Sequence, residues 1–238
     1  IAVEVYCEPV AGFGVDSPCL GDTTFFNSDI SSPIGSIISW YWDFDDPGSG
    51  IDNTSTTQSP SHFYQNTGLY NVLLVVNDIN GCIDSTFNSF IVRPNPIALF
   101  TANTVLVGSP TTFTNQSSIN TPLGGQILSW NWNFGDPLSG SNDTSTLENP
   151  EHTFSSCDTF LVSLTVIDEY GCDSTFIDTV LNFCVPNANF IADTACAGDS
   201  TYFTDLSSSP GTIISWNWDM GGLGTYESGT STISQHPI

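Results

Sequence analysis

One loop of the chain, residues 43–52, carries several acidic side chains of the kind that bind divalent cations. Ca²⁺ takes several carboxylate and carbonyl oxygens, and a flexible loop can supply them. The corresponding loop farther along the chain keeps only Asp136 and Asp143. We therefore expect that no cofactor is required, that Ca²⁺ is the one metal this loop could bind, and that a solvated turn is the alternative. The candidate ligands are Asp43, Asp45, Asp46 and Asp52.

Two histidines suggest acid–base chemistry, but their positions favour a structural role. His62 and His152 occupy the same place in two similar stretches of sequence. A catalytic histidine would not recur once per repeat, so we expect each imidazole to be buried and hydrogen-bonded within a core. No pair of carboxylates lies in an apolar setting that would raise one pKa, and no serine has the surroundings of a catalytic nucleophile. The sequence therefore predicts no catalytic residues and no enzyme.

The seven cysteines predict disulfides rather than a metal site, because no Cys-x-x-Cys motif is present. Two pairs share a spacing of twelve residues, while the second repeat carries Pro94 and Leu106 at the two aligned positions. A pair that is kept or lost together is what a disulfide requires. We therefore predict the disulfides Cys7–Cys19 and Cys184–Cys196.

A third disulfide is predicted between Cys157 and Cys172, which flank one strand of the second repeat. Cys82 aligns with Cys172 and is left over, so it is either a small core residue with a free thiol or an intermolecular link. Disulfides in a tandem chain indicate an oxidising location outside the cytoplasm.

The elements that would position these residues are repeated. One short sequence motif occurs three times. Its first tryptophans are Trp40, Trp130 and Trp216, which lie 90 and 86 residues apart. Apolar residues alternate within it, so Ile38 and Phe44 should share one face of a half-buried strand with the tryptophans. The predicted core residues are Trp40, Trp42, His62, Trp130, Trp132, His152, Trp216 and Trp218.

Short strands separated by Gly, Pro, Asn and Ser turns predict an all-β fold of sandwich modules. The repeats divide the chain into residues 1–92, 93–183 and a partial third module at 184–238 that we expect to continue beyond the chain end. The junctions between modules are short and contain proline, which favours an extended array.

The charge balance excludes several classes of protein. There are 25 acidic residues and one basic residue, Arg93, for a net charge of −24. Such a surface repels nucleic acids and anionic lipids, so we expect neither as a partner. No stretch is long and apolar enough for direct insertion into a membrane. The absence of lysine also excludes Schiff-base chemistry and isopeptide crosslinks.

Several motifs together resemble the PKD domain, an Ig-like β-sandwich. The family has a Trp-Asp-Phe-Gly-Asp segment, a His-x-Tyr segment, a Gly-x-Tyr-x-Val strand and a late Asn-Gly turn. The third repeat departs from the pattern, because Asp219-Met-Gly-Gly222 lacks the second acid. The matching segments are Trp42-Asp-Phe-Asp-Asp46, Trp132-Asn-Phe-Gly-Asp136, His62-Phe-Tyr64, His152-Thr-Phe154, Gly68-Leu-Tyr-Asn-Val72 and Asn80-Gly81.

The resemblance implies tandem Ig-like domains similar to those of giant surface adhesins and filament proteins of Bacteroidetes-type bacteria. It implies an extracellular location at the bacterial cell surface and a non-catalytic stalk that projects or assembles an adhesive element. The implied partners are neighbouring modules of the same chain, identical chains in a filament, and a cell-surface glycan or protein. The alternative is a set of accessory modules of a secreted hydrolase, in which an outward-facing Tyr41 could stack on a sugar.

Overall fold

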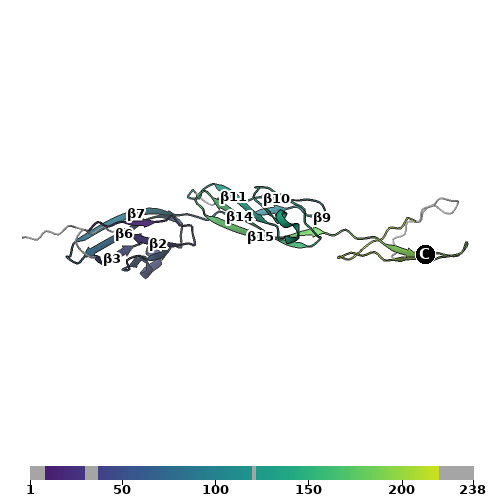
Figure 1. Cartoon of the computed structure of the whole chain (residues 1–238), viewed down its shortest axis with the longest axis horizontal. Helices are drawn as coiled ribbons and strands as arrows, with labels where there is room; N and C mark the ends of the chain where they lie inside the picture. Colours follow the sequence, from purple (N-terminus) through teal and green to yellow (C-terminus); the bar gives the residue numbers. More distant parts are fainter. Residues whose placement is uncertain (1–8, 30–36, 120–121, 220–238) are drawn as a thin grey trace, which may run out of the picture.

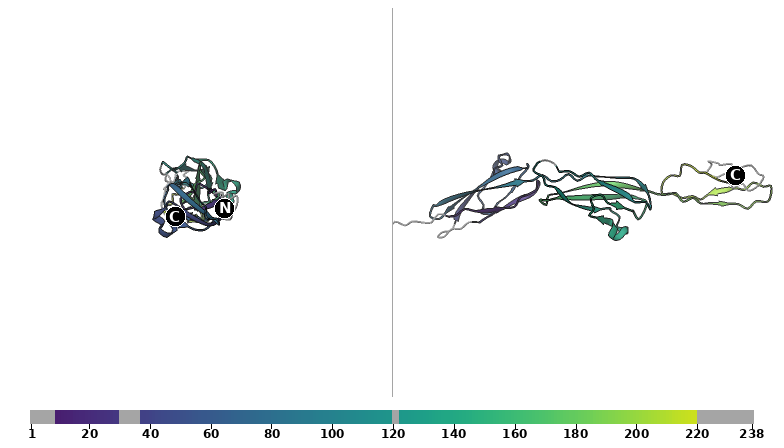
Figure 2. Two further views of the ribbon diagram at one scale, coloured as in Figure 1. Left: turned by 90° about the vertical axis from the view of Figure 1, so that its left-hand side faces the viewer. Right: turned by 90° about the horizontal axis from the view of Figure 1, so that it is seen from above.

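A computed structural model describes residues 9–29, 37–119 and 122–219 of the chain. Three modules follow one another in a line, joined by single short connections (Figure 1). Seen along the long axis, the modules overlap within one narrow outline, whereas the view from above shows them end to end (Figure 2). The chain is thus an all-β tandem array, as the sequence predicts. No helix among the described residues is both long and apolar enough to span a bilayer.

Module 1 is a sandwich of two antiparallel sheets. A short 3-10 helix, η1 (Pro47–Asn53), lies within the long polar connection that follows the tryptophan strand. One sheet has the order β1-β2-β5, with strands β1 (Phe13–Val15), β2 (Thr23–Ser28) and β5 (Ser61–Phe63). The other has the order β4-β3-β6-β7, with strands β4 (Thr54–Ser55), β3 (Ile37–Asp43), β6 (Gly68–Asp78) and β7 (Ile83–Val92).

Module 2 repeats this plan and adds one strand. Its 3-10 helix η2 (Pro137–Asp143) matches η1. One sheet has the order β13-β10-β8, with β13 (Glu151–His152), β10 (Thr111–Asn115) and β8 (Phe100–Ala102). The other has the order β12-β11-β14-β15-β9, with β12 (Thr144–Ser145), β11 (Ile127–Asn133), β14 (Thr159–Asp168), β15 (Asp173–Phe183) and β9 (Val105–Leu106). Strand β9 runs parallel to the end of β15.

Each of the first two cores is built around one tryptophan from the repeated motif. Trp42 is 0% exposed, and Trp132 is also buried. Rings from the opposite sheet surround each indole, with the centroid of Phe13 lying 5.0 Å from that of Trp42. Alternating apolar residues of β6 and β14 complete the two cores, because period-two alternation places them all on one face. Trp40 and Trp130 are half-buried and pack against the edge of the same cores.

The prediction that Ile38 faces inward is wrong. The pairing of β3 with β6 shifts between Ile37 and Ser39, and this irregularity turns Ile37 toward the core. Ile38 is 57% exposed as a result. The same shift occurs before Ser129 in module 2, where Leu128 is exposed. An extra residue in one strand reverses the alternation on one side of it, so simple period two fails there.

Module 3 contains a two-stranded sheet of β16 (Phe190–Ala192) and β17 (Phe203–Asp205). Trp216 and Trp218 follow and are half-buried. The described part of this module contains no counterpart of the β6–β7 hairpin. Phe190 is 54% exposed here, whereas Phe100, its counterpart in module 2, is buried.

Candidate functional site

The chain's single basic residue lies between modules 1 and 2. The guanidinium carbon of Arg93 is 3.4 Å from the centre of the Tyr170 ring, and Nη1 donates a hydrogen bond to the carbonyl of Leu123 at 3.1 Å. Both partners belong to module 2. The Arg93 backbone instead pairs with module 1, because its N–H donates to the carbonyl of Pro18 at 3.0 Å and its carbonyl accepts from Leu20 at 2.7 Å. Arg93 thus contacts both modules at once.

A disulfide links the same two modules beside Arg93. Cys19 is bonded to Cys172 over a sequence separation of 153 residues. Cys19 also forms an isolated parallel bridge with Arg93, which fixes its position at the end of module 1. In the loop-entropy model, a disulfide closing so long a loop stabilises the folded state by about 5 kcal/mol. The junction is therefore held by a covalent bond and by a cation–π contact.

A buried aspartate shapes the turn that brings Tyr170 and Cys172 of module 2 to the junction. Oδ1 of Asp168 accepts hydrogen bonds from the backbone N–H groups of Tyr170 and Cys172, each at 2.9 Å. Oδ2 accepts from the N–H of Gly125 at 3.3 Å. In module 1, Asp78 holds the corresponding turn through the N–H groups of Asn80 and Cys82. Side-chain acceptors of this kind fix a turn locally.

The second junction is held by a different disulfide. Cys157 of module 2 is bonded to Cys184 in the connection to module 3, with a sequence separation of 27 residues. The end of β15 also pairs with β9, and the N–H of Val107 donates to the carbonyl of Phe183 at 2.8 Å. Leu106 stands where module 1 has Cys19, so the first type of crosslink is not available here.

The three predicted disulfides are wrong, because every cysteine bonded in the structure has a partner other than the one predicted. Cys19 pairs with Cys172 in place of Cys7, which lies outside the described residues. Cys157 pairs with Cys184, and Cys196 is an exposed free thiol in place of the predicted partner of Cys184. Alignment of repeats shows which cysteines occur together, but neighbouring modules meet through their ends. The pairing therefore runs between modules, where alignment within one module cannot reveal it.

Cys82, which the sequence left over, is half-buried in the turn that Asp78 shapes. It takes part in neither of the two disulfides described above. The choice between a core thiol and an intermolecular link stays a prediction.

The structure does not bring the four predicted metal ligands together. Oδ2 of Asp46 faces His62 at 3.0 Å, while Asp43 accepts from Asn53 and Asp45 accepts from the backbone of Asn71. Asp52 is exposed on η1. Among the described residues, no three His, Cys, Asp or Glu side chains cluster as metal ligands would. Calcium binding stays a prediction, and this arrangement does not favour it.

Both histidines lie in the cores and pair with a buried aspartate. His62 stacks on Phe44 with centroids 4.5 Å apart, and its Nε2 faces Asp46. His152 stacks on Phe134 at 4.3 Å, and its Nε2 lies 3.2 Å from Oδ2 of Asp136. Each pair fastens the polar connection after the tryptophan strand to the opposite sheet. This geometry suits a structural tie, since the imidazole is buried on both faces.

Two groups near these pairs have shifted pKa values. Burial acts to raise the pKa of Asp136, but hydrogen bonds from the Ser155 hydroxyl and N–H, together with His152, outweigh it and hold the pKa below its usual value of 3.8. In module 1, burial and the nearby Asp46 carboxylate raise the pKa of the Tyr64 phenol. Its hydroxyl donates to the carbonyl of Phe44 at 3.0 Å and stays protonated.

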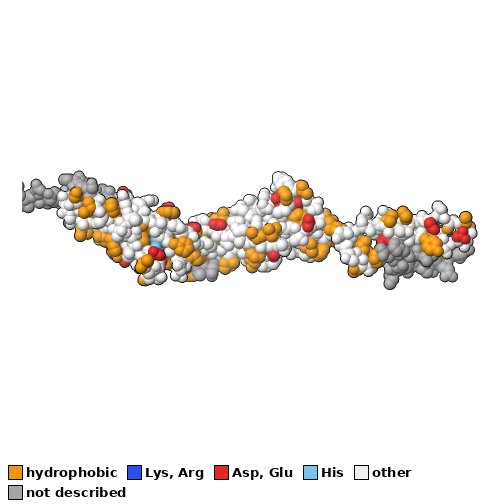
Figure 3. Space-filling view, turned by 90° about the horizontal axis from the view of Figure 1, so that it is seen from below, with side chains coloured by type: hydrophobic (Ala, Val, Ile, Leu, Met, Phe, Trp, Pro, Cys, Tyr) orange, Lys and Arg blue, Asp and Glu red, His pale blue; other side chains and the backbone are white. Residues whose placement is uncertain are grey.

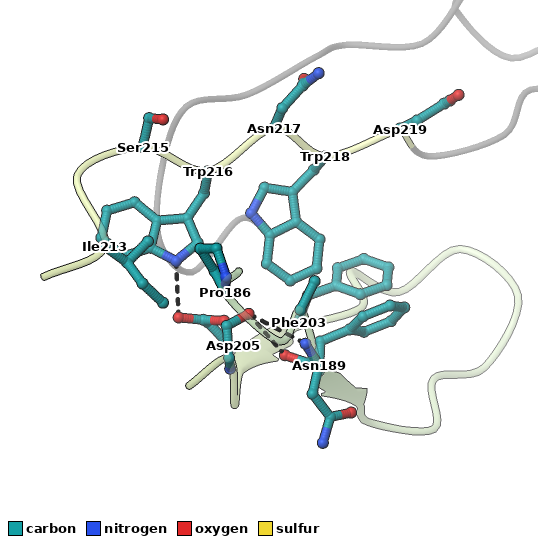
Figure 4. A pocket seen from close by; sticks show the side chains of 13 residues that line it. Pro186, Asn189, Phe203, Asp205, Ile213, Ser215, Trp216, Asn217, Trp218 and Asp219 are labelled. Carbon is teal, nitrogen blue, oxygen red and sulfur yellow. Dashed lines mark hydrogen bonds between the residues drawn. The ribbon is translucent and has the colours of Figure 1, made fainter. Parts of the chain in front are cut away.

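Module 3 has a hollow of about 430 Å³ beneath its two tryptophans. Figure 4 shows the Trp216 ring nitrogen directed at Asp205, to which it donates at 2.8 Å, and Trp218 lying beside Phe203. Trp218 and Phe203 correspond to the buried Trp42 and Phe26 of module 1. The hollow is therefore the inner face of a sandwich rather than a shaped ligand site.

Sequence reasoning missed Arg93, Tyr170 and Asp168 as junction residues. A signal for Arg93 was available, because it is the single cation of a strongly acidic chain and lies at a module boundary. Tyr170 was visible only as part of a turn. The contact between them depends on how two modules meet, and no pattern within one repeat encodes that.

Comparison with known proteins places the first two modules in one family. A family model described as the PKD domain matches residues 7–92 and 93–181. The PKD1 domain of Vibrio anguillarum Epp is 26% identical with a TM-score of 0.33, and the match covers 37% of this chain and 96% of that domain. The PKD1 domain of the Vibrio cholerae metalloprotease PrtV is 31% identical with a TM-score of 0.32, covering 36% of this chain and 98% of that domain. The two family matches span most of the sequence, and the chain belongs to the PKD domain family.

Proposed function

We propose that this chain is a non-catalytic stalk segment of a large secreted cell-surface adhesin or filament protein. Its PKD modules form a tandem shaft that projects an adhesive element away from the cell. The observation that carries the proposal is the Cys19–Cys172 disulfide, which joins one module to the next instead of closing a loop within a module.

The disulfide changes the path that a pulling force follows. A force applied at the two ends enters through the residues before Cys19, crosses the sulfur–sulfur bond, and leaves through the residues after Cys172. Most of modules 1 and 2 therefore lies outside the load path. The bypassed segment spans a sequence separation of 153 residues, which corresponds to about 500 Å of extended chain. A stalk with this connection keeps its length under load.

The contacts at the junction also limit bending. The Arg93–Tyr170 contact and the disulfide attach module 2 at two adjacent points. Two attachment points oppose rotation about either one. The Cys157–Cys184 bond fastens the start of the connection to module 3 onto module 2.

The setting suits a location outside the cell. Disulfides persist in oxidising compartments. A net charge of −24 keeps such a chain soluble, and dissolved salt screens its self-repulsion. These features support an extracellular protein at the cell surface.

Single-molecule force spectroscopy tests the proposal. The chain is attached through its two ends and stretched with and without a reductant. We expect the oxidised chain to reach a final length about 500 Å shorter than the reduced chain, because the bypassed segment cannot extend. Equal final lengths would show that the load runs through modules 1 and 2, and the stalk mechanism would be wrong.

A second candidate function is an accessory binding region of a secreted hydrolase. It rests on Tyr41, which is 44% exposed and could stack on a sugar ring. Binding on a glycan array that is lost in Tyr41→Ala would favour this function. A chain that binds no glycan retains the stalk as its best-supported role.

A further inference from the structure

The first hairpin of module 3 has the same turn as the first hairpin of module 1. In module 1 the turn after β1 reads Cys19-Leu-Gly-Asp22, and the N–H of its aspartate donates to the carbonyl of its cysteine at 3.0 Å. In module 3 the turn after β16 reads Cys196-Ala-Gly-Asp199, and the same hydrogen bond is 2.9 Å long. The glycine has φ of 99° in the first turn and 98° in the second. The two turns therefore present their cysteines alike.

In module 1 this turn is a covalent attachment point for the next module. Cys19 is bonded to Cys172, which ends a second kind of turn, Asp168-Glu-Tyr-Gly-Cys172. The aspartate of that turn accepts from the N–H of its cysteine at 2.9 Å, and the Asp78-Ile-Asn-Gly-Cys82 turn of module 1 has the same hydrogen bond at 2.8 Å. The junction thus joins a Cys-x-Gly-Asp turn of one module to an Asp-x-x-Gly-Cys turn of the next.

Cys196 has no partner within its own module. It is an exposed free thiol, and the other cysteine of module 3, Cys184, is bonded to Cys157. The turn itself does not require a thiol, because Leu106 occupies this position in module 2 and accepts the same hydrogen bond, from the N–H of Ser109 at 3.0 Å. An exposed thiol does not stay reduced in an oxidising compartment. The cysteine in module 3 therefore calls for a partner outside this module.

The turn that carries Cys196 lies at the end of module 3 farthest from module 2. The chain enters module 3 just before β16, where Asn187 and Ser208 form a bridge. Strand β16 then runs away from this entry, and the turn that joins it to β17 closes the opposite end of the hairpin. The modules follow one another in a line (Figure 1), so a further module in this line would meet module 3 at the turn.

The charges of the chain leave a further junction in need of a covalent bond. In Figure 3 acidic side chains occur along all three modules, and no basic one is visible on this face. Arg93 is the sole basic residue of the 238, and it contacts Tyr170 between modules 1 and 2. Module 3 therefore has no lysine or arginine with which to hold an acidic neighbour, and like charges repel. A disulfide holds two such modules together at any salt concentration.

We propose that Cys196 forms a disulfide with the cysteine of an Asp-x-x-Gly-Cys turn in a PKD module that follows module 3. This inference rests on the proposed stalk and names the partner that continues it. The oxidant is a protein disulfide of a thiol oxidoreductase. The Cys196 thiolate attacks one of its sulfurs and forms a mixed disulfide, and the thiolate of the partner turn then attacks Sγ of Cys196. The oxidoreductase leaves as a dithiol, with the two protons and two electrons that the two cysteines have lost.

Thiol labelling of this segment and of the whole natural protein tests the inference. Residues 1–238 produced alone, and the whole protein purified from the cells that make it, are alkylated without reduction. Both are then digested with pepsin in acid, where thiolates are scarce and disulfides do not exchange. We expect Cys196 to be alkylated in the segment alone. In the whole protein it should be protected and should appear in a peptide bonded to the cysteine of an Asp-x-x-Gly-Cys turn.

A variant of the whole protein identifies the partner a second time. Cys196→Ser should abolish the disulfide-bonded peptide, and one further cysteine, that of the partner turn, should become alkylated. The variant should fold, because Leu106 shows that the turn forms without a thiol. Cys157→Ser is the matched control. It frees Cys184 and should leave the Cys196 bond intact.

Three results would overturn the inference. One is Cys196 alkylated in the whole protein as fully as in the segment alone. Another is a bond from Cys196 to a small thiol or to a cysteine outside such a turn. The third is a bond to a separate polypeptide, which a non-reducing gel would show as a larger species. None of these results affects the stretching experiment across Cys19 and Cys172, and equal lengths in that experiment would leave the labelling of Cys196 unchanged.

Discussion

Arg93 holds its junction through the face of an aromatic ring, and this contact can be tested one side chain at a time. Tyr170→Phe keeps the ring face and should leave stability nearly unchanged. Tyr170→Ala removes it and should cost about 1 kcal/mol, the usual strength of a partly exposed cation–π contact. Urea unfolding measures both, and the disulfide should be reduced faster by thiols in the alanine variant. Equal behaviour of the two variants would show that the ring is dispensable.

Asp136 gives the stability of module 2 a defined dependence on pH. The pKa of its carboxyl in the folded protein lies below the usual 3.8. Its contribution to the free energy of unfolding is therefore complete above pH 3.8 and is lost as pH falls through the lower, folded-state pKa. We expect Asp136→Asn to be most destabilising near neutral pH and the difference from wild type to shrink below 3.8. Urea unfolding across this range measures the difference. A difference that stays constant with pH would rule out the carboxylate as its source.

For single residues, the sequence predicted which side chains are buried better than which groups they contact. The recurrence of His62 and His152 pointed to the core, and both lie there. The carboxylates that face them, Asp46 and Asp136, were assigned to a cation site or to none. Which atom meets which depends on the packing of one sheet against the other, and spacing along the chain does not record it.

The connection after each tryptophan strand contains one residue with a left-handed backbone, and the two modules use different residue types there. Gly135 has φ of 67°, and a Cβ there would lie 2.5 Å from the carbonyl of Leu161. Module 1 places Asp45 at this position with φ of 59°, and its carboxylate accepts from the N–H of Asn71. Aspartate tolerates the left-handed region better than most residues, since its side chain bonds locally.

Gly135→Ala should therefore destabilise module 2 by about 1–2 kcal/mol or more, the cost of a left-handed Cβ plus the close contact. Gly135→Asp should recover part of that loss by accepting from the N–H of Leu161, as Asp45 does from Asn71. Gly140→Ala is the control, because φ is 64° there but nothing lies within 4 Å of its Cβ. Thermal unfolding ranks the three, and an aspartate variant weaker than alanine would contradict the argument.

Strands were predicted well from alternation, and the errors have a local cause. The β6 and β14 patterns hold over their whole length because the extra residue at each register shift lies in the partner strand, β3 or β11. The β3 pattern fails at Ile38 because a register shift interrupts the ladder. Periodicity assumes regular pairing, and a bulge is visible only once the partner strand is known.

For the whole molecule, the disulfide between modules 1 and 2 should determine the shape of the array in solution. Cys19→Ser with Cys172→Ser leaves the Arg93 contact as the main restraint, so the junction should bend more. We expect small-angle scattering to show a broader distance distribution and a shorter mean maximum dimension. The unfolding free energy should fall by up to about 5 kcal/mol. Cys196→Ser is the control and should change neither quantity, and a double variant indistinguishable from it would contradict the prediction.

The extended order of the modules could be predicted from the repeats and the short proline-containing junctions. The way in which consecutive modules are fastened could not. Cys19 and Cys172 belong to different repeats, and their positions converge only because the end of module 1 meets the β14–β15 turn of module 2. Contacts between modules do not recur with the spacing of the repeats, so aligning the repeats does not reveal them.

Arg93, which stacks on Tyr170, also determines how well the chain resists digestion by proteases. Enzymes of the trypsin type cut after Lys or Arg and avoid a bond that precedes proline. The sole such residue in these 238 positions is followed directly by Pro94. These 238 residues thus offer such enzymes no favourable cleavage point, folded or unfolded. Secreted trypsin-like proteases should therefore leave this segment uncut even after its disulfides are reduced.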